Sequence, residues 1–583
     1  MRKNGLLIAL GGFLGSALLL MVIQPPLGWS WAAWGAYVPM ILASSPRLRA
    51  RTLILTGYVV GVAYWLASLW WVKPVTWQGW LTFCLYSGVL WPVLSLGIRY
   101  CRGRRWPLVA AAPVLIVGTE QLQGLFLGGF YWRFLAHSQY RNLSIIQIAD
   151  IFGAAGVSFL IAAISGLMAE WILYAVAPRG LAATSSRRRK STRAAMLVKS
   201  GVVAAAVVAS LLYGRWRVAQ TDRVVRIGPR VGVVQSNTPQ SVKETFQSGR
   251  QILEELLDLS QACAQFGADL IIWPETMVQA IINREVLELI DPNHESAQFD
   301  RALSHHAAQS NAYLLVGAYA ATPRVAADRH VDLVEKYNSA ILYDATGYKT
   351  DQRYDKIHLV PFGEVIPFQR TVPWLYGLLM WFTPYTYDYS LDYGTRYTVF
   401  DMNRPRETTP GRHRFAVMIC YEDTIPAIAR RFALDASRHK QVDWLVNISN
   451  DGWFVQLDGG SGEIVPSIEL LQHVAICAFR AVENRLAVVR SVNSGISCVI
   501  DSAGRIRDGY EGGNLPDAHT HRTAVKGWFV DHVPIDPRVT IFSKWGQWLD
   551  FCCKMGVWAI IILPVLFRWL RTMKGFRFAR TPE

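Results

Sequence analysis

The chain has 583 residues, of which 52% are hydrophobic, and its mean hydropathy of +0.20 is high for a water-soluble protein. This length exceeds one ordinary domain, and this composition excludes an entirely soluble protein, so part of the chain is expected to lie in a membrane. The formal net charge of +16 would also fit a nucleic-acid-binding protein, but the basic residues lie between apolar segments, which argues against that class.

Eight apolar segments are long enough, or nearly long enough, to cross a bilayer as helices. They lie at about residues 5–23, 31–45, 53–72, 79–98, 107–124, 151–177, 198–213 and 551–567. The second and the seventh are short for a span. The sequence therefore predicts a helical transmembrane domain at residues 1–213, with about seven helices. A further transmembrane helix and a basic tail are expected at residues 549–583.

The basic residues are concentrated in alternate connections between these segments. They lie at residues 2–3, 47–51, 99–105, 179–193 and 568–580, whereas the connections on the opposite side hold few. Because basic loops stay on the cytoplasmic side of a membrane, both termini are expected to be cytoplasmic and residues 214–548 to lie outside. The rest of the chain is close to neutral, so nucleic acid is not an expected partner.

Residues 214–548 alternate between strand-like and helix-like stretches. Runs that predict strands lie at residues 231–235, 270–273, 313–318, 339–343, 415–419, 444–448, 487–491 and 497–500. Helix-like patterns lie between several of them, at residues 241–265, 298–310, 424–435 and 466–483. Such alternation predicts an α/β layered domain outside the membrane.

Three polar residues stand at or just after the ends of predicted strands. Glu275 follows Trp273, Lys356 lies in the loop at residues 354–364, and Cys420 ends the apolar run at 415–419. Each residue alone is more often inert, as a capping acid, a surface lysine or a packed cysteine. Together they supply what covalent acyl transfer needs, because a carboxylate can take the thiol proton, an ammonium can stabilise negative charge, and a thiolate can attack a carbonyl. The eight cysteines lack metal-ligand or disulfide-framework spacing, so neither feature is expected.

These residues and the motifs around them resemble the nitrilase superfamily, and the apolar helices narrow the resemblance to its apolipoprotein N-acyltransferase family. The resemblance covers nearly the whole chain. The motifs that carry it are VVQSNTPQ at 233–240, WPET at 273–276, YDKIHLVPFGE at 354–364, ICYE at 419–422, NDGWF at 450–454, QH at 472–473, RAVENR at 480–485, NSGIS at 493–497 and, among the helices, GFYW at 129–132. It implies an α-helical transmembrane bundle joined to a nitrilase-like α-β-β-α sandwich.

The resemblance also implies a role for each site residue. Glu275 would be the general base, Lys356 the stabiliser of thiolate and oxyanion, and Cys420 the nucleophile. The residues expected to support them are Glu364, Tyr421 and Glu422. Tyr421 would contribute through its backbone N–H. The implied reaction moves an acyl chain from a membrane phospholipid, through a thioester on Cys420, to the N-terminal amine of a diacylglyceryl-cysteine apolipoprotein. No metal or other cofactor is expected, and the implied location is the bacterial inner membrane with a periplasmic catalytic domain.

Two stretches depart from the pattern of this family. Glu244 stands where the family commonly has a tryptophan, and residues 456–466 differ from its usual glycine-proline stretch. Two other functions therefore stay open: a membrane-tethered amidase that hydrolyses a small amide, and an inactive scaffold that binds lipoproteins. The apolar residues at 374–382 predict either a mobile arm over the site or a buried core helix.

Overall fold

The computed structural model describes residues 2–125, 129–176, 184–243, 248–325, 331–369, 371–381, 383, 389–404, 411–461 and 463–577. Glu244 and Phe382 therefore lie outside the described residues. The chain divides into two compact units. The helical unit comprises Met1–Trp70, Trp80–Gly214 and Gln547–Glu583, and the sheet unit comprises Trp71–Gly79 and Arg215–Gly546.

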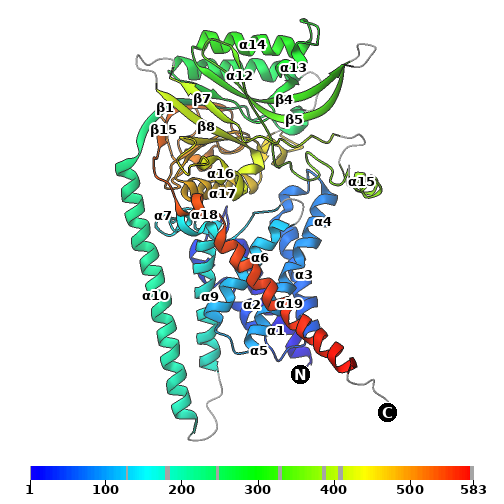
Figure 1. Ribbon diagram of the computed structural model, residues 1–583, viewed down its shortest axis with the longest axis vertical. Coiled ribbons are helices and arrows are strands. Elements are labelled where there is room, and N and C mark those ends of the chain that lie inside the picture. Colours follow the sequence, from blue (N-terminus) through cyan, green and yellow to red (C-terminus); the bar gives the residue numbers. More distant parts are fainter. Residues whose placement is uncertain are drawn as a thin grey trace. The chain divides into compact units, whose positions relative to one another are not determined.

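Long helices make up most of the helical unit (Figure 1). The longer helices that lie wholly or mainly in this unit are α1 (Arg2–Val22), α3 (Ala50–Ser68), α4 (Trp77–Gly88), α5 (Leu90–Gly103), α6 (Leu108–Leu122), α9 (Ala154–Val176), α10 (Thr184–Val224) and α19 (Trp548–Arg577). Among the described residues, six stretches are long and apolar enough to cross a membrane: Gly5–Val22, Ala50–Ser68, Trp77–Gly103, Leu108–Leu125, Ala154–Val176 and Arg193–Val224. They coincide with six of the eight segments predicted from the sequence.

The predicted spanning helix at residues 31–45 is wrong. This stretch forms the 3-10 helix η1 (Ser30–Gly35) and the short helix α2 (Val38–Ala43), each of six residues. A helix needs about 20 residues to cross a bilayer. Helix α2 ends at Ala43 and is capped by Ser44, two residues before Pro46, and a proline disfavours the helical conformation of the residue before it. The predicted segment at 551–567 lies within α19.

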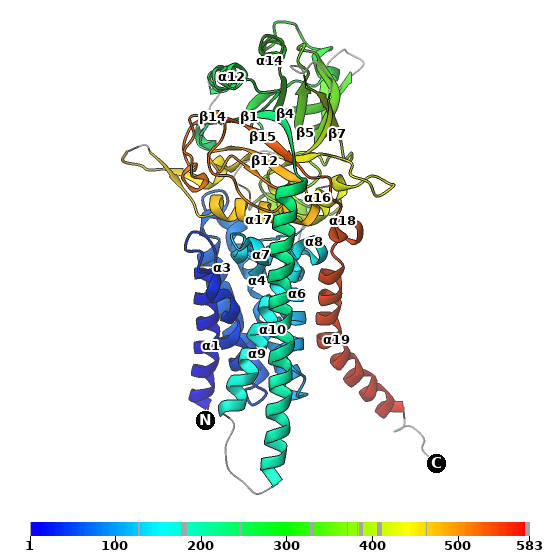
Figure 2. The ribbon, with the colours of Figure 1, turned by 90° about the vertical axis from the view of Figure 1, so that its left-hand side faces the viewer.

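The sheet unit contains two large β-sheets (Figure 2). The first has the strand order β14-β15-β1-β2-β4-β5-β6, and β3 pairs with β4. Its strands are β1 (Arg226–Gln235), β2 (Leu270–Ile272), β3 (Val278–Ile281), β4 (Tyr313–Val325), β5 (Val331–Tyr343), β6 (Lys349–Asp355), β14 (Gly512–Gly513) and β15 (Gly527–Ile535). The second has the order β13-β12-β9-β8-β7. Its strands are β7 (Val399–Asn403), β8 (Arg412–Ile419), β9 (Trp444–Asn450), β12 (Ala487–Asn493) and β13 (Cys498–Ile500).

The two sheets face each other, and helices cover their outer faces (Figure 2). The hydroxyl of Ser491 on β12 donates to the backbone carbonyls of Val234 and Ile272 at 3.0 and 2.9 Å, so the sheets are in direct contact. Helices α12 (Ser248–Gln265) and α14 (Glu295–Ser310) cover the first sheet, while α16 (Pro426–Ala433) and α17 (Glu469–Asn484) cover the second. The side chains of Leu256 and Leu303 on α12 and α14 are fully buried in the same core as the strands. The predicted α-β-β-α sandwich is confirmed.

Parallel pairing brings several strand ends to the same place. Strand β2 pairs in parallel with β1 and β4, and β9 pairs in parallel with β8 and β12. The carboxyl ends of parallel strands meet at one edge of a sheet, which is where α/β enzymes place reactive side chains. Glu275 follows β2 by three residues, Cys420 follows β8 directly, and Asn450 ends β9.

Candidate active site

Lys356 follows β6 directly and joins two glutamates in a buried ion-pair network. Its Nζ atom lies 2.9 Å from Oε1 of Glu275 and 2.8 Å from Oε2 of Glu364, and its side chain is 1% exposed. Burial by itself would lower the pKa of Lys356, but the charges of the two glutamates raise this pKa well above its usual range. The lysine is therefore a fixed cation, which suits it to stabilise a negative charge and not to act as a base.

Two asparagines complete the hydrogen bonds of Glu275. The side-chain amide of Asn338 on β5 donates to Oε1 of Glu275 at 2.7 Å and to Oε1 of Glu364 at 2.8 Å. The backbone N–H of Asn450 donates to Oε2 of Glu275 at 2.9 Å. Each carboxylate oxygen of Glu275 accepts a hydrogen bond, so its orientation is fixed before any substrate arrives.

Cys420 begins the 3-10 helix η5 (Cys420–Thr424) at the end of β8. Its backbone φ of 52° lies in the left-handed region, which costs a non-glycine residue about 1 kcal/mol or more, and such strain clusters at active sites. Burial raises the pKa of the Cys420 thiol well above its usual range; the charge of Glu275 adds to this rise and the charge of Lys356 opposes it. Glu275 and Lys356 thus shift the pKa of the thiol in opposite directions.

The raised pKa predicts how Cys420 reacts with an alkylating agent. The thiol is expected to be protonated at neutral pH, so its alkylation by iodoacetamide should speed up by roughly tenfold per pH unit between pH 7 and 9, in step with the thiolate fraction. Peptide mass spectrometry would follow Cys420 separately from the exposed Cys552. A rate at Cys420 that is already maximal at pH 7 would contradict this resting state.

Glu422 binds the loop that carries the lysine to the strand that carries the cysteine. Its Oε1 atom accepts the backbone N–H groups of Ile357 at 2.7 Å and His358 at 3.0 Å, and its Oε2 atom accepts that of Ile419 at 2.8 Å. The hydroxyl of Tyr354 also donates to this carboxylate at 2.9 Å. Glu422 is fully buried, so it supports the site from behind and does not face a substrate.

Replacing Glu422 by glutamine is expected to destabilise the sheet unit. All its neighbours donate hydrogen bonds, and the amide group of glutamine would turn an N–H group toward one of these donors. Leaving a buried donor without an acceptor costs about 1–3 kcal/mol. The thermal unfolding midpoint of the solubilised protein should fall by several degrees, whereas Glu463→Gln, at an exposed position, should leave it unchanged. Equal midpoints for both variants would contradict the role given to Glu422.

The last of the predicted supporting residues is Tyr421. Tyr421 is half-buried, and its ring stacks against His358 with the ring centroids 5.8 Å apart, so it is not a core aromatic.

Helix α15 (Pro373–Met380) has no buried residue, so the alternative of a buried core helix is wrong. Trp374 and Trp381 are 73% and 86% exposed. An exposed apolar helix of this kind fits contact with lipid or with a partner.

Sequence reasoning missed Asn338 and Gly317. Asn338 lies just before the predicted strand at 339–343, and nothing in its sequence context marks it. Gly317 on β4 lets the turn after β2 pack closely, because a Cβ atom there would lie 2.4 Å from the carbonyl oxygen of Pro274 and 2.7 Å from Cα of Glu275. A glycine inside a predicted strand is the one signal that indicated such a close approach.

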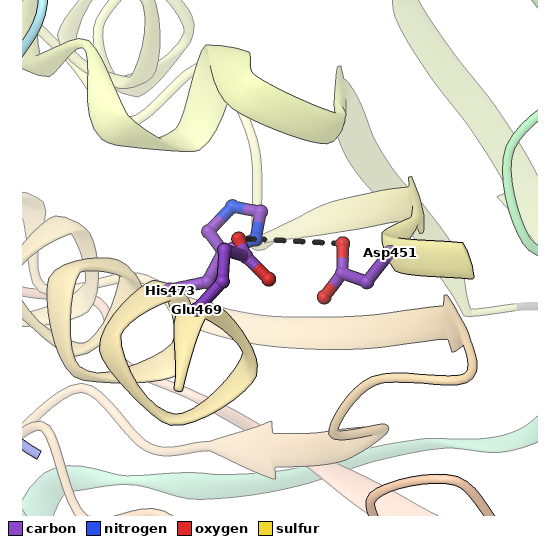
Figure 3. Close-up of side chains that lie close together, drawn as sticks. All are labelled: Asp451, Glu469 and His473. Carbon is purple, nitrogen blue, oxygen red and sulfur yellow. Dashed lines mark ion pairs between the residues drawn. The ribbon is translucent and has the colours of Figure 1, made fainter. Parts of the chain in front are cut away.

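A second group of buried charged side chains is formed by Asp451, Glu469 and His473 (Figure 3). Asp451, Glu469 and His473 each offer a ligand atom, and these atoms lie within 4.8 Å of one another, a spacing that fits a metal ion. However, Nε2 of His473 lies 2.8 Å from Asp423, and Arg490 lies 2.5 Å from Asp423 and 3.8 Å from Asp451. A histidine and an arginine thus already pair with these acids, so we assign no metal to the cluster.

Comparisons with known proteins agree with both units. A family model described as "Carbon-nitrogen hydrolase" matches residues 230–512, and one described as "Apolipoprotein N-acyltransferase N-terminal domain" matches residues 16–167. An apolipoprotein N-acyltransferase of Geobacter metallireducens is 30% identical over 583 aligned residues, covering 97% of this chain and 96% of the relative. An apolipoprotein N-acyltransferase of Gloeobacter violaceus is 28% identical over 575 aligned residues, covering 93% of this chain and 91% of the relative. Among solved structures, an amidase from Nesterenkonia sp. is 15% identical, covers 54% of this chain and 93% of its own, and has a TM-score of 0.33.

The two-sheet sandwich and the buried glutamate, lysine and cysteine define a nitrilase-like carbon-nitrogen hydrolase domain, here in one chain with apolar helices. The match of the two family models and the relative covering 97% of the chain go further. The chain belongs to the apolipoprotein N-acyltransferase family.

Proposed function

We propose that this protein transfers an acyl chain from a membrane phospholipid to the N-terminal amine of a diacylglyceryl-cysteine apolipoprotein. The observation that carries the proposal is the buried pair of Lys356 and Glu275, 2.9 Å apart, whose charges act on Cys420 at the end of β8. This set supplies a base, a cation and a nucleophile for covalent acyl transfer. The family relationship supports the choice of substrates.

In the first half of the reaction, Glu275 takes the proton of the Cys420 thiol while the sulfur attacks the ester carbonyl of the phospholipid. The tetrahedral intermediate carries its negative charge on the former carbonyl oxygen, and Lys356 stabilises that charge. When the intermediate collapses, the bond to the glycerol oxygen breaks, and this oxygen takes the proton from Glu275. The products are a lysophospholipid and an acyl thioester on Cys420.

In the second half, the neutral α-amine of the apolipoprotein attacks the thioester carbonyl. Glu275 accepts a proton from the amine nitrogen, and Lys356 again stabilises the oxyanion. The carbon–sulfur bond breaks, the sulfur of Cys420 recovers the proton, and the acyl chain leaves as an amide on the apolipoprotein. Two half-reactions at one cysteine predict ping-pong kinetics.

The apolar helices support a membrane location, because both proposed substrates are anchored in lipid. We place both termini in the cytoplasm and residues 214–548 on the periplasmic side of a bacterial inner membrane, on the distribution of basic loops. In this arrangement residues 1–213 and 549–583 hold the membrane segments and the residues between them form the catalytic domain. The exposed Trp374, Leu378 and Trp381 on and beside α15 fit contact with lipid chains.

The test is an assay of the purified protein with a phospholipid that carries a labelled acyl chain and with a synthetic diacylated lipopeptide. Label on the lipopeptide as an N-terminal amide, with lysophospholipid released, is the expected result. Hydrolysis of a small amide without any lipid product would favour the amidase. Neither activity, with the lipopeptide still bound, would favour the scaffold.

A further inference from the structure

The buried charge cluster made of the three side chains in Figure 3 and of Asp423 and Arg490 beside them is not used by the reaction described above. Its members come from four different elements: Asp423 from η5, Asp451 from η6 (Asp451–Phe454), Glu469 and His473 from α17, and Arg490 from β12. All five side chains are at most 2% exposed. Burying five charged groups is costly, so the cluster needs a reason beyond stability.

Ser449 connects this cluster to the cysteine. It lies on β9, which runs parallel to β8 with Ile448 beside Ile419, so the next residues, Ser449 and Cys420, are also neighbours. The hydroxyl of Ser449 donates to Oδ1 of Asp451 at 2.6 Å. Burial raises the pKa of the Cys420 thiol, the charge of Asp451 adds to this rise, and Ser449 lowers it. Ser449 therefore links Asp451 to the strand end that carries Cys420.

His473 also contacts Asp451, the residue to which Ser449 donates its hydrogen bond. Its Nδ1 atom lies 3.5 Å from Oδ1 of Asp451 and 3.2 Å from Oε1 of Glu469, and its Nε2 atom lies 2.8 Å from Asp423. Both ring nitrogens thus face carboxylates, and these carboxylates favour the positively charged, doubly protonated ring. The neighbouring acids also raise the pKa of His473 well above its usual range, although burial and Arg490 lower it.

We infer that Ser449, Asp451 and His473 form a positioning network that orients the Cys420 thiol and sets the charge behind it. The inference rests on the proposed role of Cys420 as the nucleophile. Asp451 holds the Ser449 hydroxyl in place, and the positive ring of His473 offsets the negative charge of Asp451. Without this offset, Asp451 would oppose formation of the thiolate.

The charges that face each group fix the direction of the expected effects. The groups that act on Cys420 are Glu275, Lys356 and Asp451. The charged groups that face His473 are Asp423, Asp451, Glu469 and Arg490. Removing the negative charge of Asp451 should make the thiolate easier to form, and removing the positive charge of His473 should make it harder.

The experiment measures the alkylation of Cys420 by iodoacetamide from pH 6 to 10 in the full-length protein, with peptide mass spectrometry as the readout. Asp451→Asn is expected to shift the pH profile to lower pH, and His473→Gln to higher pH, each by roughly one unit. Glu483→Gln removes a buried charge from the same helix, where Glu483 pairs with Arg480, and should leave the profile in place. Thermal unfolding identifies any variant that fails to fold.

Ser449→Ala tests the connection itself. It is expected to lower the rate of thioester formation by at least about tenfold without changing the KM for phospholipid, and Ser449→Thr should restore part of the rate because it keeps the hydroxyl. Shifts of Asp451→Asn and His473→Gln in the same direction, or no shift in folded proteins, would overturn the network. Opposite shifts in a protein that forms no thioester would instead overturn the proposed function and leave the network standing, because alkylation needs no acyl donor.

Discussion

Replacement of Cys420 by alanine is expected to lower acyl transfer by at least about 10⁴-fold and to remove every covalent acyl adduct from the protein. The sulfur is the atom that forms the thioester, so no other residue in the Lys356 network can take its place. The variant should still fold, because the substitution removes one side-chain atom from a site that is 9% exposed. Acyl transfer measured with labelled phospholipid and a diacylated lipopeptide checks the expectation.

The matched control is Cys552→Ala, which removes an exposed free cysteine elsewhere in the chain. It should keep full activity and a normal acyl adduct. An active Cys420→Ala variant would show that the acyl chain passes directly between substrates or through another nucleophile. Loss of activity in both variants would point to a general sensitivity of the protein to cysteine replacement.

Replacement of Glu275 by glutamine is expected to slow acyl transfer by about 10²–10⁴-fold at neutral pH, the usual contribution of a general base. Because the Cys420 thiol is protonated at this pH, the reaction needs a group that takes its proton. Glutamine has nearly the same shape but cannot accept a proton. The rate of the variant should recover in part as pH rises, since hydroxide then forms the thiolate without Glu275.

The pH dependence separates a missing base from a damaged site. Glutamine also places an N–H group near the Lys356 ammonium or near the backbone N–H of Asn450, so some loss will come from position alone. A loss from position would persist at high pH, whereas a loss of the base would not. Glu335→Gln, at the outer end of β5, removes a carboxylate from the same sheet and should keep the wild-type rate. A rate for Glu275→Gln that falls with rising pH would contradict its role as the base.

Strand ends were the most predictable part of this protein. The runs before Glu275 and Cys420 are short, apolar and followed by polar residues, and the structure places both runs in sheets. Lys356 follows β6, a strand whose residues are mostly polar, and none of the predicted strand runs covers residues 349–355. Lys356 was singled out by the chemistry it would add to Glu275 and Cys420 and by its motif, not by an apolar run, because β6 is an edge strand with one neighbour.

The contacts that assemble the site come from residues far apart in the chain, and local patterns do not reveal them. Strand β15 pairs with β1 although about 300 residues separate them, which no periodicity predicts. Asn338 reaches Glu275 through strand pairing within the first sheet, and Asn450 reaches it from the second sheet. In the helical unit, the apolar stretch at 31–45 has the composition of a spanning helix. It nevertheless forms two short helices separated by a turn, which composition alone does not predict.

The most direct test of the central claim is mass spectrometry of the Cys420 peptide after the purified protein has been incubated with phospholipid alone. The account predicts a thioester-linked acyl mass on Cys420 that hydroxylamine removes and that a diacylated lipopeptide discharges with formation of an N-acyl amide. The contrary result would be a preparation that N-acylates the lipopeptide but shows no acyl mass on Cys420, in samples quenched at low pH so that any thioester is preserved. This result would contradict the proposed mechanism.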